Sequence, residues 1–277
     1  MKYKKTALFA CASIAAGAFA YQQNHELQVE HITCINKQLP KALKGLKIVH
    51  LSDLHNANFG KHQKKLIKEI INLQPDMIVI TGDICDRRHL SIRSLRPIEE
   101  LINQLVLLAD VYYVTGNHEA DSLLLPNLLE MLKHAGVHVL RNEVALLEYH
   151  NQPFALIGID DIQFFQNDQK SFYEMLISLK EQSKHLFSML LVHRPEMFYI
   201  YEKVGYDIIC SGHAHGGQIK ISKRKGIFAP GQGFFPKYCS GAYEKNNATM
   251  IVSRGLGNSG HLLRLNNRPH IISITLC

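Results

Sequence analysis

The sequence lacks the features that mark several common classes of small protein. None of its six cysteines forms a CxxC pair, which argues against a disulfide framework and against a structural zinc site. No internal repeat, low-complexity tract or linker rich in Pro, Gly and Ser divides the chain after its first segment. No nucleic-acid-binding motif of a recognisable class is present. These absences favour one globular domain over residues 28–277, in which most cysteines are small buried side chains.

The apolar run near the N terminus is shorter than a typical membrane span. Three lysines precede the run 7–20, whereas a span needs roughly 20 apolar residues. The run ends in Ala18-Phe19-Ala20, a small-x-small pattern that is typical of a cleavage site. We therefore predict that residues 1–22 are a signal peptide or an N-terminal membrane anchor, which lies outside the fold. A buried N-terminal helix is the alternative.

The chain is basic, with a net charge of +7 and a pI near 9.0. This balance favours an anionic partner such as a phosphate compound, a lipid headgroup or a nucleic acid, but it also fits plain solubility. One basic run has aromatic neighbours: Lys220, Lys223, Arg224 and Lys225, with Phe228, Phe234 and Phe235. This run either docks on an anionic bilayer or forms a solvated loop.

Short apolar runs alternate with amphipathic stretches along the rest of the chain, which indicates sheets covered by helices. The runs predict strands at residues 46–51, 77–80, 111–114, 154–157, 189–192, 208–210, 249–253 and 270–276. The amphipathic stretches predict helices at residues 62–73, 97–109, 123–135 and 171–179.

Polar residues that can bind a metal directly follow five of the predicted strands. They are Asp53 and His55, then Asp83, then Asn117 with His118, then His193, and finally His213 and His215. Ligands of α/β folds bind beyond the carboxyl ends of the strands, so we expect these five turns to converge on one place. A single Asp after a strand is often a helix cap, but capping does not explain five such turns in order.

The order of these residues resembles the motifs of the calcineurin-like metallophosphoesterases over about residues 46–276. The motifs are DxH at 53–55, GDxxD at 82–86, GNHE at 116–119, a lone histidine at 193 and GHxH at 212–215. The longer runs GHAHGGQI at 212–219 and SRGLGNSG at 253–260 resemble the bacterial membrane-associated phosphodiesterase branch. The resemblance implies a four-layer α/β/β/α sandwich, in which two mixed sheets are flanked by helices.

The resemblance also implies two metal sites that share one carboxylate. The first ion would be held by Asp53, His55, Asp83 and His215, and the second by Asp83, Asn117, His193 and His213. Imidazole, carboxylate and amide ligands suit manganese, iron or zinc. Two such ions would share a hydroxide that attacks phosphorus. His118 would donate a proton to the leaving group, bond the phosphoryl group or support a ligand.

Three residues near these motifs have expected supporting roles. Asp86 and Glu119 are expected to orient histidines. Arg87 either contacts substrate phosphate or is exposed at the start of a helix. The second motif departs from the GDxVDRG of the family's protein Ser/Thr phosphatases, because Arg88 stands in the place of its final glycine.

The sequence thus predicts a dinuclear, metal-dependent phosphodiesterase or pyrophosphatase that hydrolyses a lipid- or nucleotide-linked phosphate. We expect it to be exported or associated with the bacterial cell membrane, with a membrane surface and no nucleic acid as partner. A phosphomonoesterase and a non-catalytic metal-binding scaffold of the same fold are the alternatives. The complete ligand set, together with His118, favours an enzyme, because scaffolds tend to lose ligands or the proton donor.

Overall fold

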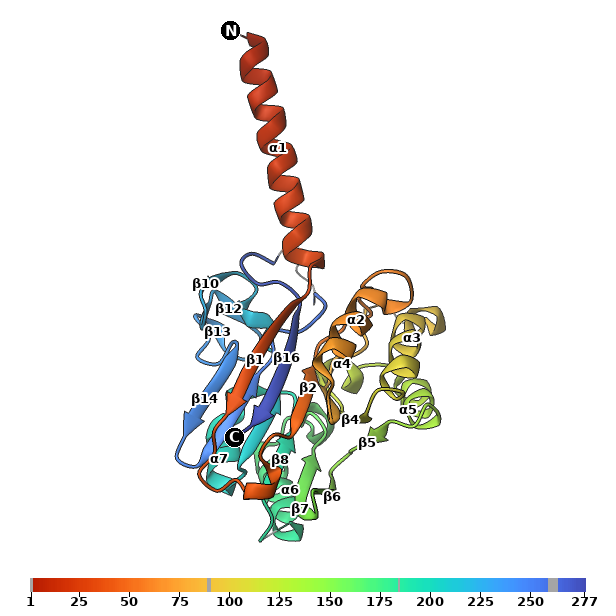
Figure 1. The fold of residues 1–277 in the computed structure, drawn as a ribbon, viewed down its shortest axis with the longest axis vertical. Coiled ribbons are helices and arrows are strands. Elements are labelled where there is room, and N and C mark those ends of the chain that lie inside the picture. Colours follow the sequence, from red (N-terminus) through yellow and green to blue (C-terminus); the bar gives the residue numbers. More distant parts are fainter. Residues whose placement is uncertain (1, 89–90, 184, 259–263) are drawn as a thin grey trace.

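The strands of the protein form two large sheets that pack face to face (Figure 1). The computed structural model describes residues 2–88, 91–183, 185–258 and 264–277. Sheet 1 has the strand order β1-β16-β2-β3-β4-β5, and sheet 2 has the order β14-β15-β9-β8-β7-β6.

Sheet 1 contains both directions of strand. Its strands are β1 (Gln28–Cys34), β2 (Lys47–Leu51), β3 (Met77–Thr81), β4 (Asp110–Val114), β5 (His138–Val139) and β16 (His270–Leu276). β2 to β5 run parallel, whereas β16 is antiparallel to β2 and parallel to β1. The amino end of β1 therefore lies at the same edge as the carboxyl ends of β2, β3 and β4.

Sheet 2 is parallel in its centre and antiparallel at both edges. Its strands are β6 (Glu143–Tyr149), β7 (Gln152–Gly158), β8 (Ser188–Leu191), β9 (Ile208–Ser211), β14 (Gly241–Lys245) and β15 (Ala248–Val252). Two short hairpins lie apart from the large sheets. β10 (Lys220–Ser222) pairs with β11 (Lys225–Gly226), and β12 (Phe228–Ala229) pairs with β13 (Gly233–Phe234).

Alternate side chains of the central strands enter two different cores. In β3, Met77 and Val79 lie between the sheets, where they share a cluster with Met189 of β8. Ile78 and Ile80 point the other way, into the cluster beneath the helices of sheet 1. Burial on both faces explains why such strands read as continuous apolar runs rather than as alternating ones.

Helices cover the outer face of each sheet and complete four layers. α2 (Lys64–Leu73), α3 (Arg96–Leu105) and α5 (Leu125–His134) pack on sheet 1. α6 (Gln169–Gln182) and α7 (Phe198–Val204) pack on sheet 2. In α2 the buried face carries Leu66 and Ile70, and burial of each stabilises the fold by ~1.5–3 kcal/mol. The predicted four-layer sandwich is confirmed.

Short helical turns connect several of these elements. They are η1 (Lys41–Leu43), η2 (Lys61–Gln63), η3 (Ile92–Leu95), α4 (Asn117–Ala120), η4 (Ile162–Phe165), η5 (Pro195–Met197) and η6 (His215–Gly217). The helix predicted at 62–73 starts two residues late, because His62 and Gln63 both have a positive φ. The helix predicted at 97–109 ends at Leu105.

The helix α1 (Lys2–His25) precedes β1 and projects away from the two sheets (Figure 1). Its last turns touch the body: Gln23 Oε1 accepts the N–H of Asn267 at 3.2 Å, and Asn24 Oδ1 accepts the N–H of Arg264 at 3.1 Å. Ile14 is 72% exposed, so the alternative of a buried N-terminal helix does not hold for this part of α1. Among the described residues, no helix has the length and apolar character needed to cross a membrane. The signal or anchor role of residues 1–22 stays a prediction.

Candidate metal centre

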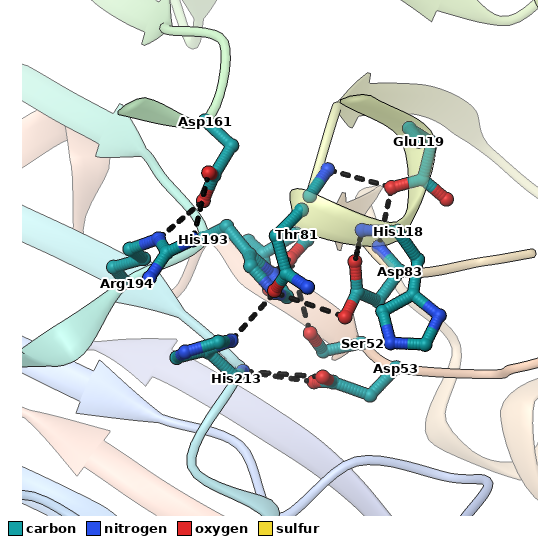
Figure 2. A network of polar contacts seen from close by, with 12 residues as sticks. Ser52, Asp53, Thr81, Asp83, His118, Glu119, Asp161, His193, Arg194 and His213 are labelled. Carbon is teal, nitrogen blue, oxygen red and sulfur yellow. Dashed lines mark hydrogen bonds and ion pairs between the residues drawn. The ribbon is translucent and has the colours of Figure 1, made fainter. Parts of the chain in front are cut away.

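The five predicted turns meet at the carboxyl ends of strands from both sheets (Figure 2). β2, β3 and β4 of sheet 1 and β8 and β9 of sheet 2 lead into these turns. The turns bring together all seven predicted ligands: Asp53, His55, Asp83, Asn117, His193, His213 and His215. Each of the seven residues is at most 9% exposed. Such burial of polar side chains requires compensating partners.

Asp53, His55 and His215 form the first group of candidate ligands. The two Nε2 atoms of His55 and His215 lie 3.2 Å apart. Asp53 Oδ1 lies 3.3 Å from Nε2 of His215 and 3.9 Å from Nε2 of His55. Two ring nitrogens and a carboxylate oxygen therefore face one small volume.

Asp83, His193 and His213 form the second group, with Asn117 beside it. His193 Nε2 lies 3.2 Å from Asp83 Oδ2, 3.2 Å from His213 Nδ1 and 3.2 Å from Asn117 Oδ1. This nitrogen is the centre of the group, and the amide oxygen of Asn117 points at it.

The Asp83 carboxylate joins the two groups. Its Oδ2 lies 3.2 Å from His193 Nε2 and 3.8 Å from His55 Nε2. Its Oδ1 accepts the backbone N–H of His118 at 2.8 Å, which holds the carboxylate in this orientation (Figure 2). One oxygen of Asp83 is thus fixed, and the other faces both sets of imidazoles.

Three of the four candidate histidine ligands are prepared to bind as neutral imidazoles, and His193 is the exception. His193 Nδ1 donates to the carbonyl of Thr81 at 2.7 Å, so Nε2 is the atom that faces the other candidate ligands. Burial opposes protonation of His193, but the charge of Asp83 and the bond to it raise its pKa to about 10, so a cation would displace the proton on Nε2. Burial lowers the pKa of His55 to about 3 and the pKa values of His213 and His215 well below their usual value. Neutral imidazoles bind a cation without first losing a proton.

The donor set fits two divalent cations. Burial, together with the nearby Asp83, raises the pKa of Asp53 to about 6, which shows how poorly this pocket solvates negative charge. Bound cations would neutralise the carboxylates of Asp53 and Asp83 and accept the lone pairs of the neighbouring imidazoles. A set of imidazole, carboxylate and amide oxygen without thiolate suits manganese, iron or zinc.

The backbone around the ligands is strained. Five of them have a positive φ: Asp53 (50°), His55 (47°), Asp83 (51°), His213 (63°) and His215 (46°). A non-glycine residue in this region costs on the order of 1 kcal/mol, and such residues persist only where the surroundings hold them. Here the N–H of Asp53 bonds the Gly82 carbonyl and the N–H of His55 bonds the Asp83 carbonyl, both at 3.0 Å.

Glu119 stabilises the turn that carries Asp83. Its Oε2 accepts the N–H groups of Asp83 at 2.8 Å and Gly116 at 2.6 Å, and its Oε1 accepts the N–H of Cys85 at 3.1 Å. The expectation that Glu119 orients a histidine is therefore wrong. A Cβ at Gly116 would lie 2.3 Å from Asp83 Oδ1, so this close approach requires glycine.

His118 lies beside the first group, and its ring centroid is 4.5 Å from that of His55. Its Nδ1 lies 3.3 Å from Asp86 Oδ1, so Asp86 orients a histidine as expected. Burial opposes protonation of His118, but the bond to Asp86 and the Asp83 charge raise its pKa above the usual value. Arg87 pairs with Asp121 in a turn and its side chain is 44% exposed.

Sequence analysis missed a sixth strand end that braces the site. Asp160 and Asp161 follow β7, and the acidic pair after an apolar run is the same kind of pattern that predicted the other five turns. Asp160 Oδ1 accepts the hydroxyl of Thr115 at 2.8 Å, in the turn before Asn117. Asp161 Oδ2 accepts Nε of Arg194 at 2.8 Å, next to His193 (Figure 2).

The segment singled out at 253–260 packs on the Asp53 turn. The N–H of Leu256 bonds the Ser52 carbonyl at 3.0 Å, and the N–H of Gly257 bonds the Asp53 carbonyl at 2.7 Å. Gly255 has a φ of 73°, and a Cβ there would lie 2.7 Å from Asp53 Cβ. The last two residues of the run, 259 and 260, lie outside the described residues.

Known proteins share this sequence pattern and fold. The model of the family described as "Calcineurin-like phosphoesterase" matches residues 46–217. The chain is 30% identical to the metallophosphoesterase YkoQ of Bacillus subtilis, over 96% of this chain and 97% of YkoQ. It is 29% identical to the phosphodiesterase YaeI of Escherichia coli, over 83% of this chain and 82% of YaeI. A dimetal phosphatase from Danio rerio has a similar fold, with a TM-score of 0.50 and 12% identity over 80% of this chain and 89% of that protein. The resemblance is confirmed, and the chain belongs to the calcineurin-like phosphoesterases.

Proposed function

We propose that this protein is a phosphodiesterase or pyrophosphatase whose seven strand-end residues hold two divalent metal ions. The observation that carries the proposal is the position of Asp83 Oδ2, which lies 3.2 Å from one histidine group and 3.8 Å from the other. Family membership makes the chain a metal-dependent phosphoesterase. The preference for diesters is supported by the 29% identical relative that is named a phosphodiesterase.

The seven residues would divide between the two ions as the family resemblance implies. Asp53, His55 and His215 would hold the first ion, Asn117, His193 and His213 the second, and Asp83 both. When bound, the ions would acidify a water molecule and neutralise charge on the phosphoryl oxygens. The fixed turns of the chain would keep the ligands in place without further rearrangement.

His118 is the residue we assign to proton transfer. Its Nδ1 lies 3.3 Å from Asp86 Oδ1 and 3.2 Å from the backbone nitrogen of Arg87, so we assign proton transfer to Nε2, the other ring nitrogen. A raised pKa favours a ring that still carries its proton near neutral pH. His118 would therefore donate that proton as the ester bond breaks.

A lipid- or nucleotide-linked phosphate is the proposed substrate, and the bacterial cell membrane, or the space beyond it, is the proposed location. The support is the lysine-rich start of α1, the apolar run that follows it and the net charge of +7. N-terminal sequencing of the mature protein tests the location: cleavage after Ala20 indicates export, and an intact N terminus indicates an anchor.

A metal-reconstituted substrate screen tests the reaction. The protein is stripped with a chelator and reloaded separately with manganese, iron or zinc. Each form is then offered phosphodiesters, pyrophosphates and phosphomonoesters, lipid-linked ones included. We expect diesters or pyrophosphates to be cleaved fastest. Faster cleavage of monoesters with every metal would contradict the proposal, and bound metal without hydrolysis of any substrate would indicate a scaffold.

A further inference from the structure

The segment after the metal-binding GHAH turn is strongly basic. No acidic residue occurs between Asp207 and Glu244, whereas this stretch contains five lysines and arginines. Four of the five lie in or next to the β10–β11 hairpin: Lys220, Lys223, Arg224 and Lys225. A basic stretch of this kind attracts anionic partners. The carboxylate of Glu30, from β1, lies beside it, with Oε1 4.0 Å from Lys223 Nζ.

Large apolar side chains are exposed beside these charges. Ile221 is 63% exposed, Phe234 is 73% exposed and Phe235 is 72% exposed. Ile221 and Phe235 line the same hollow of about 670 Å³, together with Arg224 and Lys225. Single exposed apolar residues are common, but a cluster interleaved with basic residues is typical of a surface that enters a membrane interface. We call Ile221, Lys223, Arg224, Lys225, Phe234 and Phe235 the docking surface.

A second hollow, of about 550 Å³, separates the β10–β11 hairpin from the amino end of β1. It is lined by Lys220, Lys223 and Arg254, and Glu30 is the one carboxylate among its described lining residues. Glu30 is already bonded to His270 Nε2 at 3.0 Å. Arg254 is 5% exposed, and its Nε has no hydrogen-bond partner among the described residues. Arg254 also donates to Gln28 Oε1 at 3.0 Å, so its charge lies beside the hollow without a carboxylate bonded to it among the described residues. The basic lining suits an anion such as a phosphate group.

The docking surface is carried by β10 and β11 and by the end of β13, and β10 and β13 lie at the end of the body from which α1 projects (Figure 1). A Cβ at Gly217, two residues after the candidate ligand His215, would lie 2.5 Å from Gly226 Cα in β11. The hairpin therefore packs directly on the ligand turn. α1 enters β1 at the same edge, since β1 runs opposite to β2.

We propose that the docking surface binds the face of a bilayer of anionic phospholipid. Ile221, Phe234 and Phe235 enter the interface, and the basic side chains and the second hollow take headgroup phosphates. Docking in this orientation presents the metal centre to phosphate esters at the bilayer surface. The inference rests on the membrane location proposed above and not on the metal chemistry.

A single introduced tryptophan reports contact directly, because the chain contains no tryptophan. Phe235→Trp in the full chain is mixed with vesicles of phosphatidylglycerol and phosphatidylcholine in equal parts, or of phosphatidylcholine alone. We expect the indole emission to shift to the blue with the anionic vesicles only. The shift should weaken as salt is added, since the Debye length shortens.

Charge reversal tests the basic half of the docking surface. Lys223→Glu, Arg224→Glu and Lys225→Glu, combined in the Phe235→Trp protein, should weaken binding to the anionic vesicles by about 100-fold or more. The matched control reverses three exposed lysines beyond the opposite end of β1: Lys37→Glu, Lys41→Glu and Lys44→Glu. This control should bind like the Phe235→Trp protein.

Several results would overturn the proposal. One is unchanged Phe235→Trp emission while the protein sediments with the vesicles, which would mean attachment through α1 alone. Another is an equal shift for Ile35→Trp, since Ile35 is 71% exposed just after the far end of β1. A third is a shift with duplex DNA and none with vesicles. None of these experiments measures hydrolysis, so a negative result would not contradict the proposed phosphoesterase reaction.

Discussion

Glu119→Gln tests the idea that one buried carboxylate holds the bridging ligand in place. Glu119 accepts three backbone N–H groups, from Asp83, Cys85 and Gly116. A glutamine keeps the shape but turns one acceptor into a donor. With its oxygen at the Oε2 position it would still accept two of these N–H groups, while its NH₂ would face the N–H of Cys85.

The cost follows from the bonds lost. A hydrogen bond to a charged group contributes about 1.5–3 kcal/mol, and the two bonds that remain lose their charge. We expect the free energy of unfolding to fall by about 2–4 kcal/mol and Tm to fall by roughly 5–15 °C. Because the Asp83 turn loosens, metal affinity should fall about 10–100-fold, as when the residues that support a metal ligand are changed.

Thermal unfolding of the metal-free protein and titration against a competing chelator measure the two effects separately. Asp207→Asn is the matched control. Asp207 is also a buried acid, which accepts the N–H of Ser188 at 2.8 Å, but it lies at the amino end of β9, away from the metal centre. The control should lose stability and keep its metal affinity. Equal metal binding by Glu119→Gln and the parent protein would refute the reasoning.

Four further predictions follow from the site. Asp83→Ala should lose both metal ions and activity, measured by metal analysis and a rate assay, and retention of two ions would contradict it. His118→Ala should keep its metal and hydrolyse a substrate with a poor leaving group about 10²-fold more slowly, and a normal rate on that substrate would contradict the proton-donor role. Gly116→Ala should lower metal affinity, because its Cβ would lie 2.3 Å from Asp83 Oδ1, whereas Gly136→Ala, with open space around it, should not. Burial lowers the pKa of His50 from 6.5 to about 3, so between these pH values the unfolded chain binds a proton that the folded chain does not. The free energy of unfolding should therefore fall by about 1.4 kcal/mol for each pH unit as the pH is lowered through this range. His50→Gln should remove that part of the pH slope in denaturant titrations, and an unchanged slope would contradict the assignment.

The sequence predicts the central strands and the site well, because both depend on a local pattern. A strand buried on both faces reads as an apolar run, and a polar turn directly after it marks the carboxyl edge. The pattern was less visible at the edges of the sheets. β6 (Glu143–Tyr149) is half-buried and mixes acidic with apolar residues, and β14 (Gly241–Lys245) has only one buried residue. Neither strand gives a strong periodic signal.

The supporting contacts could not be predicted, because most of them join residues that lie far apart in the chain. Glu119 directly follows His118 in sequence, yet two of its three partners are the N–H groups of Asp83 and Cys85 in another turn. Asp161 lies 33 positions before its partner Arg194. A one-dimensional pattern identifies a carboxylate near a ligand, but only the packed turns show which donor it meets.

The order in which the chain is synthesised bears on when the metal centre can form. Ser52 and Asp53 belong to the first turn of the site, but their carbonyls bond Leu256 and Gly257, about two hundred residues later. β16 follows every other described strand, yet it lies between β1 and β2 in sheet 1. While these residues are still inside the ribosome, sheet 1 lacks β16 and the carbonyls of Ser52 and Asp53 lack their partners. The protein would therefore acquire its ions only after β16 has left the ribosome, and a translation-arrested fragment ending before residue 250 should bind them weakly.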